Sequence, residues 1–159
     1  MMNQHNWKPY VFWIGLAQGV GLLSGFLSRR ATAAFGATAL QSALSPPAIL
    51  FPLVWTILYT LMGISAARIY LVPPSPLRSR SLNLFVLQLI VNFFWSLIFF
   101  NARAYGFALV WLILLWILVL WMILSFRKVD LRAARLQIPY LLWLTFAAYL
   151  NFAVWMLNK

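Results

Sequence analysis

The chain lacks most of the side chains that enzymes use for catalysis: it has no cysteine, one histidine and one acidic residue. Without cysteine there is no disulfide, no thiolate nucleophile and no sulfur ligand for a metal. The histidine, His5, lies in the N-terminal tail, which argues against an imidazole metal site or a histidine-ligated haem. Asp130 is the only acid, so neither a carboxylate pair nor a Ser-His-Asp triad can form. We therefore expect no metal, no bound cofactor and no conventional hydrolase or kinase chemistry.

Charge is also scarce, and nearly all of it is positive. Charged residues make up 8% of the chain, whereas a soluble domain carries about 25%. Twelve Lys and Arg residues face the single acid and give a net charge of +11. A soluble protein with this balance would suggest a nucleic-acid partner, but here the bases cluster at the ends of apolar runs, where positive residues set membrane topology. We therefore discount nucleic acid.

Long apolar runs fill the rest of the sequence, which is 65% hydrophobic. A run of about 20 apolar residues can span the hydrocarbon core of a bilayer, and only a helix satisfies its backbone there. We expect five such helices in one domain, 1–159, which is an all-α membrane protein with a five-transmembrane-helix bundle. The expected spans are 10–27, 48–67, 82–100, 104–126 and 136–157. The first link, 28–45, is long enough to form a lid over the bundle mouth.

The distribution of bases predicts an orientation. Lys8, the second link and the fourth link place most bases on one side, and Arg29, Arg30, Arg103 and Lys159 fall on the other. Positive residues remain in the cytoplasm, so we expect the N-terminus there.

Three spans each carry a face that mixes aromatic rings with amides or hydroxyls at helical spacing. The members are Phe51, Trp55, Tyr59, Met62 and Ala66 in the second span, Gln88, Asn92, Trp95 and Phe99 in the third, and Tyr140, Trp143, Ala147, Leu150 and Val154 in the fifth. Such faces serve either as hydrogen-bonded packing between helices or as the lining of a pocket for a large, flat, mostly apolar ligand. Periodicity alone leaves these two interpretations level.

Glycines in the first span also allow two interpretations. Gly15 with Gly19, and Gly21 with Gly25, have the spacing that lets helix backbones approach closely. The close approach could occur at a dimer face or inside one bundle.

Three segments together resemble the TspO/MBR family, also called the tryptophan-rich sensory protein/translocator protein family. They are SPPAILFPLVWTILYTLMG at 45–63, QLIVNFFWSLIFF at 88–100 and PYLLWLTFAAYLN at 139–151. Their order and spacing match, and the resemblance covers almost the whole chain. It implies a five-helix bundle, commonly dimeric, in a bacterial cell membrane, with a pocket that the first link closes. It also implies porphyrin or haem as ligand, which shifts our interpretation of the aromatic faces to a pocket.

Carried over by position, the resemblance assigns ligand-binding positions in all three faces and in the link. These are Phe51, Trp55, Tyr59, Asn92, Trp95, Trp143, Ala147, Leu150 and Leu44. At position 44 the family usually has a tryptophan, which follows Lys-Pro-x, whereas this chain reads Gln-Ser-Ala-Leu over 41–44. A bound ring plane therefore loses one stacking partner.

We carry three hypotheses forward. The leading one is a membrane receptor or transporter in which a tetrapyrrole stacks on Trp55 and Trp143, with hydrogen bonds from Tyr59 and Asn92. Arg29 and Arg30 are more readily explained by topology and lipid headgroups than by contacts to propionates. The second is an enzyme that degrades porphyrin in light, with Trp55 and Trp143 as electron donors and no acid/base machinery. The third is a scaffold that modulates other membrane proteins.

Overall fold

A computed structural model describes residues 6–159, so that His5 lies outside the described residues. This part of the chain is helical and contains no strand. The elements are α1 (Trp7–Thr38), α2 (Leu50–Tyr70), α3 (Pro76–Ser96), the π-helical turn η1 (Leu97–Asn101), α4 (Tyr105–Val129), α5 (Leu131–Leu136) and α6 (Ile138–Leu157). Within residues 6–159, five stretches are long and apolar enough to cross a membrane. The expected all-α, five-span membrane fold is confirmed.

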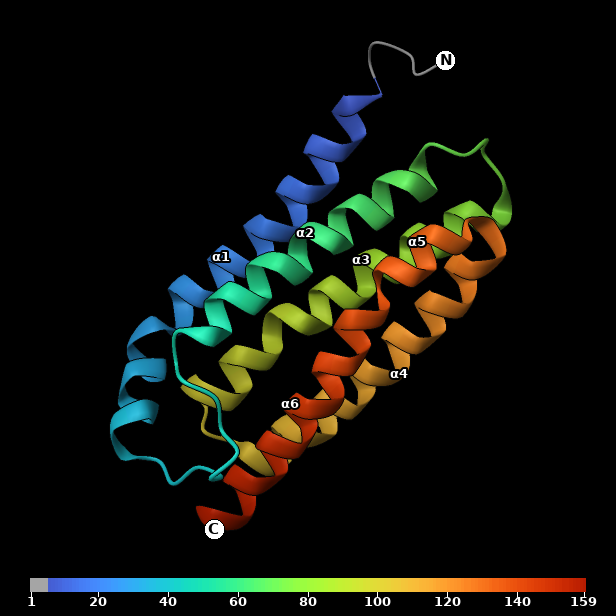
Figure 1. The fold of residues 1–159 in the computed structure, drawn as a ribbon. Coiled ribbons are helices and arrows are strands. Elements are labelled where there is room, and N and C mark those ends of the chain that lie inside the picture. Colours follow the sequence, from blue (N-terminus) through green and yellow to red (C-terminus); the bar gives the residue numbers. More distant parts are fainter. Residues whose placement is uncertain (1–5) are drawn as a thin grey trace.

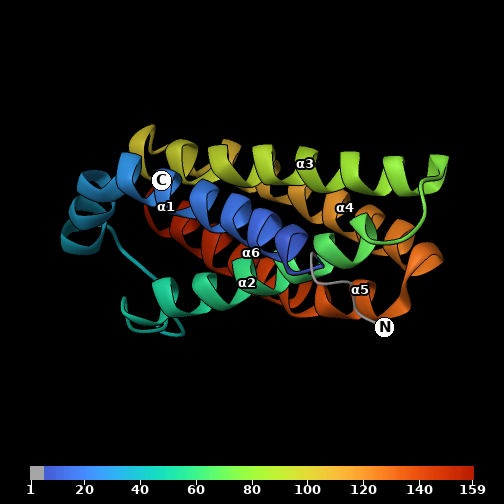
Figure 2. The same ribbon diagram turned by 90° about the horizontal axis from the view of Figure 1, so that it is seen from above.

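The helices form an elongated bundle in which neighbours along the chain are not always neighbours in space (Figure 1). α1 lies between α2 and α3, as Figure 2 shows, and α4 packs on α3, α5 and α6. α2 packs on α5 at one end of the bundle, but its backbone makes few close approaches to α6. We call the end that contains α5 the basic end, and the end where α1 and α6 terminate the link end.

The first helix is longer than we expected. It continues to Thr38 instead of ending at Leu27, so the lid-like loop that we expected at 28–45 is reduced to a link over 39–49. The segment after Leu27 is polar but rich in alanine and free of proline, and alanine has the highest helix propensity. The hydrophobic run therefore ends before the helix does, and the additional helical turns pack beside η1 at the link end.

The other boundaries differ from the expected ones mainly at prolines. α3 begins at Pro76, where Ser75 caps the helix by accepting a hydrogen bond from the Arg78 N–H. The last span is divided at Gln137 into α5 and α6, so that Pro139 lies in the first turn of α6. Pro52 likewise lies in the first turn of α2. A proline in a first turn costs no helical hydrogen bond, and neither helix is broken there.

Asp130 joins the helices at the basic end. Its carboxylate accepts a 2.7 Å hydrogen bond from the Arg68 Nε of α2. Its other oxygen caps α5 through the Arg132 N–H. The carboxylate is only 18% exposed, and the guanidinium is its nearest opposite charge. The sole acid thus fixes α2 against the start of α5.

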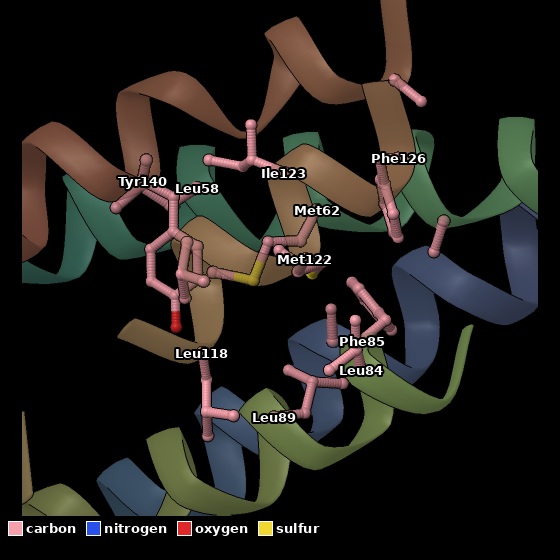
Figure 3. Packing of buried hydrophobic residues seen from close by; sticks show 14 of the residues in the cluster. Leu58, Met62, Leu84, Phe85, Leu89, Leu118, Met122, Ile123, Phe126 and Tyr140 are labelled. Carbon is pink, nitrogen blue, oxygen red and sulfur yellow. The ribbon is translucent and has the colours of Figure 1, made fainter. Parts of the chain in front are cut away.

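The core near the basic end is closely packed. Met62, Phe85, Met122 and Phe126 are fully buried, and Figure 3 shows them meeting between the helices. Gly63 permits α2 to touch α1, because a Cβ there would overlap the backbone of Ile14. Packing of this kind, more than exclusion of water, holds helices together inside a membrane.

Candidate ligand-binding site

A continuous chain of hydrogen bonds links three helices near the middle of the bundle. The Tyr59 hydroxyl of α2 donates to the Asn92 Oδ1 of α3 at 2.7 Å. The Asn92 Nδ2 donates to the Tyr140 hydroxyl of α6 at 2.8 Å, and this hydroxyl donates to the Gln88 Oε1 at 2.8 Å. All four side chains are buried. The polar members of the three predicted faces therefore meet one another.

Trp55 covers this polar chain on the side of α2. Its ring centroid lies 5.4 Å from that of Tyr59 and 6.2 Å from that of Tyr140. The indole is half-buried, in contrast to the two tyrosines beneath it. An aromatic surface therefore lies directly above a set of oriented hydroxyl and amide groups.

Trp143 belongs to a separate aromatic group between α2 and α6. Its ring lies 5.8 Å from Phe51 and 5.7 Å from Phe146. It also lines an open, almost wholly apolar groove of about 430 Å³, where the two backbones stand apart. The groove residues are Val54, Ile57, Leu58, Pro139, Leu142, Trp143 and Phe146. Helices α2 and α6 are thus joined through rings and leave a hollow on their outer side.

Trp95 is held farther toward the link end. Its Nε1 donates to the Asn151 Oδ1 at 3.2 Å, and Asn151 in turn donates to the Tyr105 carbonyl at 2.8 Å. The indole stacks on Phe99, with ring centroids 5.0 Å apart. Phe99 lies in η1, and π-helical turns of this kind occur frequently at functional sites. Phe35, in the unexpected extension of α1, contacts the same ring cluster.

The remaining predicted positions are less closely grouped. Ala147 and Leu150 are half-buried on α6, and Ala147 packs against the main core. Leu44 lies on the link and is 68% exposed, so its side chain does not join the aromatic group. Trp55, Tyr59 and Asn92 are thus brought together, Phe51 and Trp143 meet in a separate group, and Leu44 stands apart from both.

Two residues of the polar chain were absent from the predicted site. Tyr140 and Gln88 lie on the faces that the spacing identifies. Each is one turn from a predicted site residue, Trp143 and Asn92 respectively, and this spacing is the signal that could identify them. Within residues 6–159, the Gln88 Nε2 has no hydrogen-bond partner although the side chain is fully buried. Gln88 therefore offers a free donor beside the tyrosines.

No charged side chain belongs to this group of residues. Arg29 and Arg30 are exposed on α1, and the Arg29 Nη1 donates to the Phe26 carbonyl of the same helix at 2.7 Å. The Arg29 guanidinium also lies 4.0 Å from the centre of the Phe26 ring. Among residues 6–159, no cluster of His, Cys, Asp or Glu could hold a metal ion. Recognition at this site would rest on rings, hydroxyls and amides.

At the link end, α2 does not extend as far as the helices around it. Phe51, in the first turn of α2, meets Trp143, and the helix from Trp143 to Leu157 is about 21 Å long. α6 therefore extends well beyond α2 at the link end, as does α1. Figure 1 shows the link 39–49 crossing this gap from the end of α1 to the last turns of α6 before it returns to α2.

Known proteins of similar sequence are membrane proteins of one family. The sequence profile of the TspO/MBR family matches residues 13–156. The chain is 35% identical over 149 residues to "Tryptophan-rich protein TspO" of Chlorobaculum tepidum, covering 91% of this chain and 92% of that protein. It is 40% identical over 114 residues to "Protein CrtK" of Rhodobacter capsulatus, with 71% of each chain covered. It is also 36% identical over 143 residues to "Translocator protein" of Sus scrofa, covering 86% of this chain and 85% of the relative.

Proposed function

The chain belongs to the TspO/MBR family, and from this premise we propose that it binds a tetrapyrrole such as a porphyrin within the bilayer, as a receptor or transporter. The observation that carries the proposal is the half-buried Trp55 ring beside the hydrogen-bonded chain Tyr59–Asn92–Tyr140, with Trp143 one turn along α6 from Tyr140. Indole faces suit a flat ring, and buried amides and hydroxyls orient it.

The geometry supports a large apolar ligand over a small polar one. The groove beside Trp143 has a volume of about 430 Å³, within the range of about 300–1,000 Å³ that is typical of ligand pockets. Its lining supplies dispersion contacts, including the Trp143 and Phe146 rings, and Phe51 contacts the Trp143 ring.

A fluorescence titration with protoporphyrin IX tests this function. We expect saturable quenching of the indole emission in detergent-solubilised protein and about tenfold weaker binding in Trp143→Phe, because the ring surface shrinks. Trp121→Phe is the matched control, since Trp121 is exposed on the outer side of α4. Quenching that never saturates, or that weakens equally in both variants, contradicts the proposal and favours the scaffold hypothesis.

Light-driven degradation of the porphyrin is the second candidate, because the Tyr59 and Tyr140 rings lie 5.4 and 6.2 Å from the Trp55 ring, and these three rings could exchange electrons with an excited ligand. The porphyrin would be oxidised and dioxygen would be the oxidant. Illumination of the complex in air separates the candidates. Loss of the main porphyrin absorption band that is suppressed in Trp55→Phe and Trp143→Phe supports degradation, whereas a stable spectrum leaves binding alone.

We also propose that the N-terminus faces the cytoplasm. The bases of the basic end, which include Lys8, Arg80, Arg127 and Arg132, are exposed, and such residues remain on the cytoplasmic side. A single cysteine introduced at Ser79, which is exposed in the first turn of α3 and precedes the expected span, should react with a membrane-impermeant maleimide in inside-out vesicles but not in intact cells. The reverse pattern contradicts this orientation.

We also propose that two copies of the chain form a homodimer through α1. Gly15 and Gly19 have open space where a side chain would be, so that they face outward, whereas Gly21 packs against the Tyr59 ring. Gly25 also faces open space, but only in the pair Gly15 and Gly19 do both members face outward and leave a flat strip for a second copy. Gly15→Leu should reduce cross-linking between copies in the membrane, and Gly36→Leu should not, because Gly36 also faces open space but lies beyond the expected span.

A further inference from the structure

The apolar groove between α2 and α6 is open toward the bilayer, and two arginines precede it on the same face of the chain. Its edges include Ile57 and Leu142, whose side chains are 52% and 65% exposed. Figure 1 shows α5 leading into α6 at the basic end. The arginines of α5 and the groove residues of α6 follow helical spacing, in the order Arg132, Arg135, Pro139, Leu142 and Phe146.

The division between α5 and α6 preserves this alignment. Gln137 has backbone angles close to helical ones, with φ −91° and ψ −9°. Its carbonyl accepts a 3.2 Å hydrogen bond from the Leu141 N–H, as in a continuous helix. The guanidinium groups of α5 therefore lie in line with the groove, on the side of the basic end.

These two arginines have no acidic partner within residues 6–159. Asp130 is the only acidic side chain of the sequence, and it is bonded to Arg68. Arg132 and Arg135 are exposed, and neither belongs to an ion pair in the described part of the chain. Topology explains why bases gather at this end, but it does not require two of them to lie in line with an apolar groove.

The dimensions of this surface match one leaflet of a bilayer. The rise along the chain from Arg135 to Phe146 is about 16 Å. Half of a hydrocarbon core about 30 Å thick is about 15 Å. The groove has a volume of about 430 Å³ and an almost wholly apolar lining, so it suits a hydrocarbon chain. A phosphate group above such a chain would lie at the level of the arginines.

We propose that the groove and the two arginines bind an anionic phospholipid, with one acyl chain in the groove and the headgroup phosphate at Arg132 and Arg135. Guanidinium groups bind phosphate through charge-assisted hydrogen bonds. The orientation proposed above places the basic end in the cytoplasmic leaflet, where anionic lipids are concentrated. This lipid site does not rest on tetrapyrrole binding. Its acyl chain is the occupant that a tetrapyrrole would displace from the Trp143 ring.

Native mass spectrometry tests the headgroup contact on protein released from nanodiscs with equal amounts of phosphatidylglycerol and phosphatidylcholine. Wild type should retain phosphatidylglycerol in preference. One base near an anionic surface changes affinity about fivefold, so Arg132→Gln with Arg135→Gln should lower this preference about 25-fold. Arg29→Gln with Arg30→Gln removes the same charge from exposed positions outside α5 and should leave the preference unchanged. Equal retention of both lipids by wild type, or equal losses in the two double variants, overturns the proposal.

Leu142→Trp tests the groove without changing charge. The larger ring occupies apolar space at the edge of the groove. Retention of phosphatidylglycerol should fall about tenfold if about two methylene groups of the acyl chain lose their burial. Leu124→Trp, at an exposed position on α4, is the matched control and should retain lipid as wild type does. Equal retention in the two variants overturns the placement of the acyl chain.

Fluorescence quenching decides the same point if Leu142→Trp disturbs folding. Phospholipids with brominated acyl chains quench the indoles that they touch. Brominated phosphatidylglycerol should quench wild type more than brominated phosphatidylcholine does. This excess should disappear in Trp143→Phe, because Trp143 lines the groove, and persist in Trp121→Phe, because Trp121 is exposed on α4. An excess that persists in Trp143→Phe overturns the proposal. No tetrapyrrole is added, so the result is independent of porphyrin binding.

Discussion

The basic end and the link end of this bundle are built differently. Toward the basic end, Met62, Phe85, Met122 and Phe126 are fully buried, and the Arg68–Asp130 pair fastens the helices together. Toward the link end, the large rings of Phe51, Trp55, Trp95 and Trp143 are only half-buried, and hydrogen bonds hold the tyrosines and amides beside them.

This difference suggests a division of roles, in which the basic end stabilises the fold and the link end recognises a ligand. Full burial of flexible and aromatic side chains leaves no room for a ligand and provides the dispersion contacts that keep membrane helices together. Half-buried rings beside fixed amides leave surface that a flat molecule can cover. Substitutions toward the basic end should therefore reduce stability, whereas those toward the link end should change binding first.

The largest loss of stability is expected in Phe85→Ala. The side chain is fully buried against Trp13, and its removal leaves a cavity that costs about 3–5 kcal/mol. Thermal unfolding followed by circular dichroism in detergent measures the effect. Phe94→Ala, at an exposed position on the same helix, is the control and should change stability little. Similar losses in both variants would erase the distinction between core and periphery.

A smaller loss is expected in Gly63→Ala. The added methyl group would overlap the Ile14 backbone, which cannot rotate away as a side chain could, so α1 and α2 must separate at a cost of about 1–3 kcal/mol. Gly15→Ala has open space and should be neutral or slightly stabilising, since alanine favours helix more than glycine does. The same unfolding experiment compares them, and a loss of stability in Gly15→Ala contradicts its outward placement.

Asn92→Leu should reduce both the stability of the fold and the affinity for the ligand. It removes the acceptor of Tyr59 and the donor to Tyr140, and each unpartnered buried polar group costs about 1–3 kcal/mol. Unfolding and a protoporphyrin IX titration, measured on the same samples, should both be impaired. Asn83→Leu, on the exposed side of α3, should change neither. Impaired stability with unchanged affinity would assign the hydrogen-bonded chain to support alone.

The smallest effect is expected in Leu44→Trp. The substitution restores a ring to the link at the position where the family usually has tryptophan, and an added ring contact contributes about 0.5–1.5 kcal/mol. Protoporphyrin IX should bind several-fold more tightly, with no change in unfolding temperature. Leu40→Trp, at another exposed position on the link, is the control. An equal gain in both variants would indicate that the ring acts through bulk hydrophobicity.

The five membrane spans, and the faces through which three of them meet, could be predicted from local sequence patterns. Hydropathy identifies the five membrane crossings, and helical spacing places Tyr59, Asn92 and Tyr140 on faces that do meet. Both features repeat over many residues of one helix, so no knowledge of neighbouring helices is required. The family resemblance then supplied the interpretation that spacing left open.

The differences between the structure expected from the sequence and the observed structure have two physical causes. α1 continues past Leu27 because its helix depends on backbone hydrogen bonds and alanine-rich sequence, which hydropathy does not measure. The Arg68–Asp130 pair, the Asn158–Leu40 hydrogen bonds and the Asn151–Trp95 bond join residues far apart in the sequence, and no local pattern specifies them. The π-helical turn at Leu97–Asn101 belongs to the same class, because it lies where Phe35 and Tyr105 pack on Phe99.

Asp130 is the single carboxylate side chain of a chain with twelve cationic ones, and it is already engaged with Arg68. Electroneutrality therefore has to be met by ions outside the polypeptide, at the surfaces where the other guanidinium and ammonium groups emerge. Anionic phospholipids concentrate such charge in the plane of the membrane and attract basic residues near its surface. The lipid composition of the surrounding leaflet is thus a component of the folded protein's charge balance, and detergents without charged headgroups omit it.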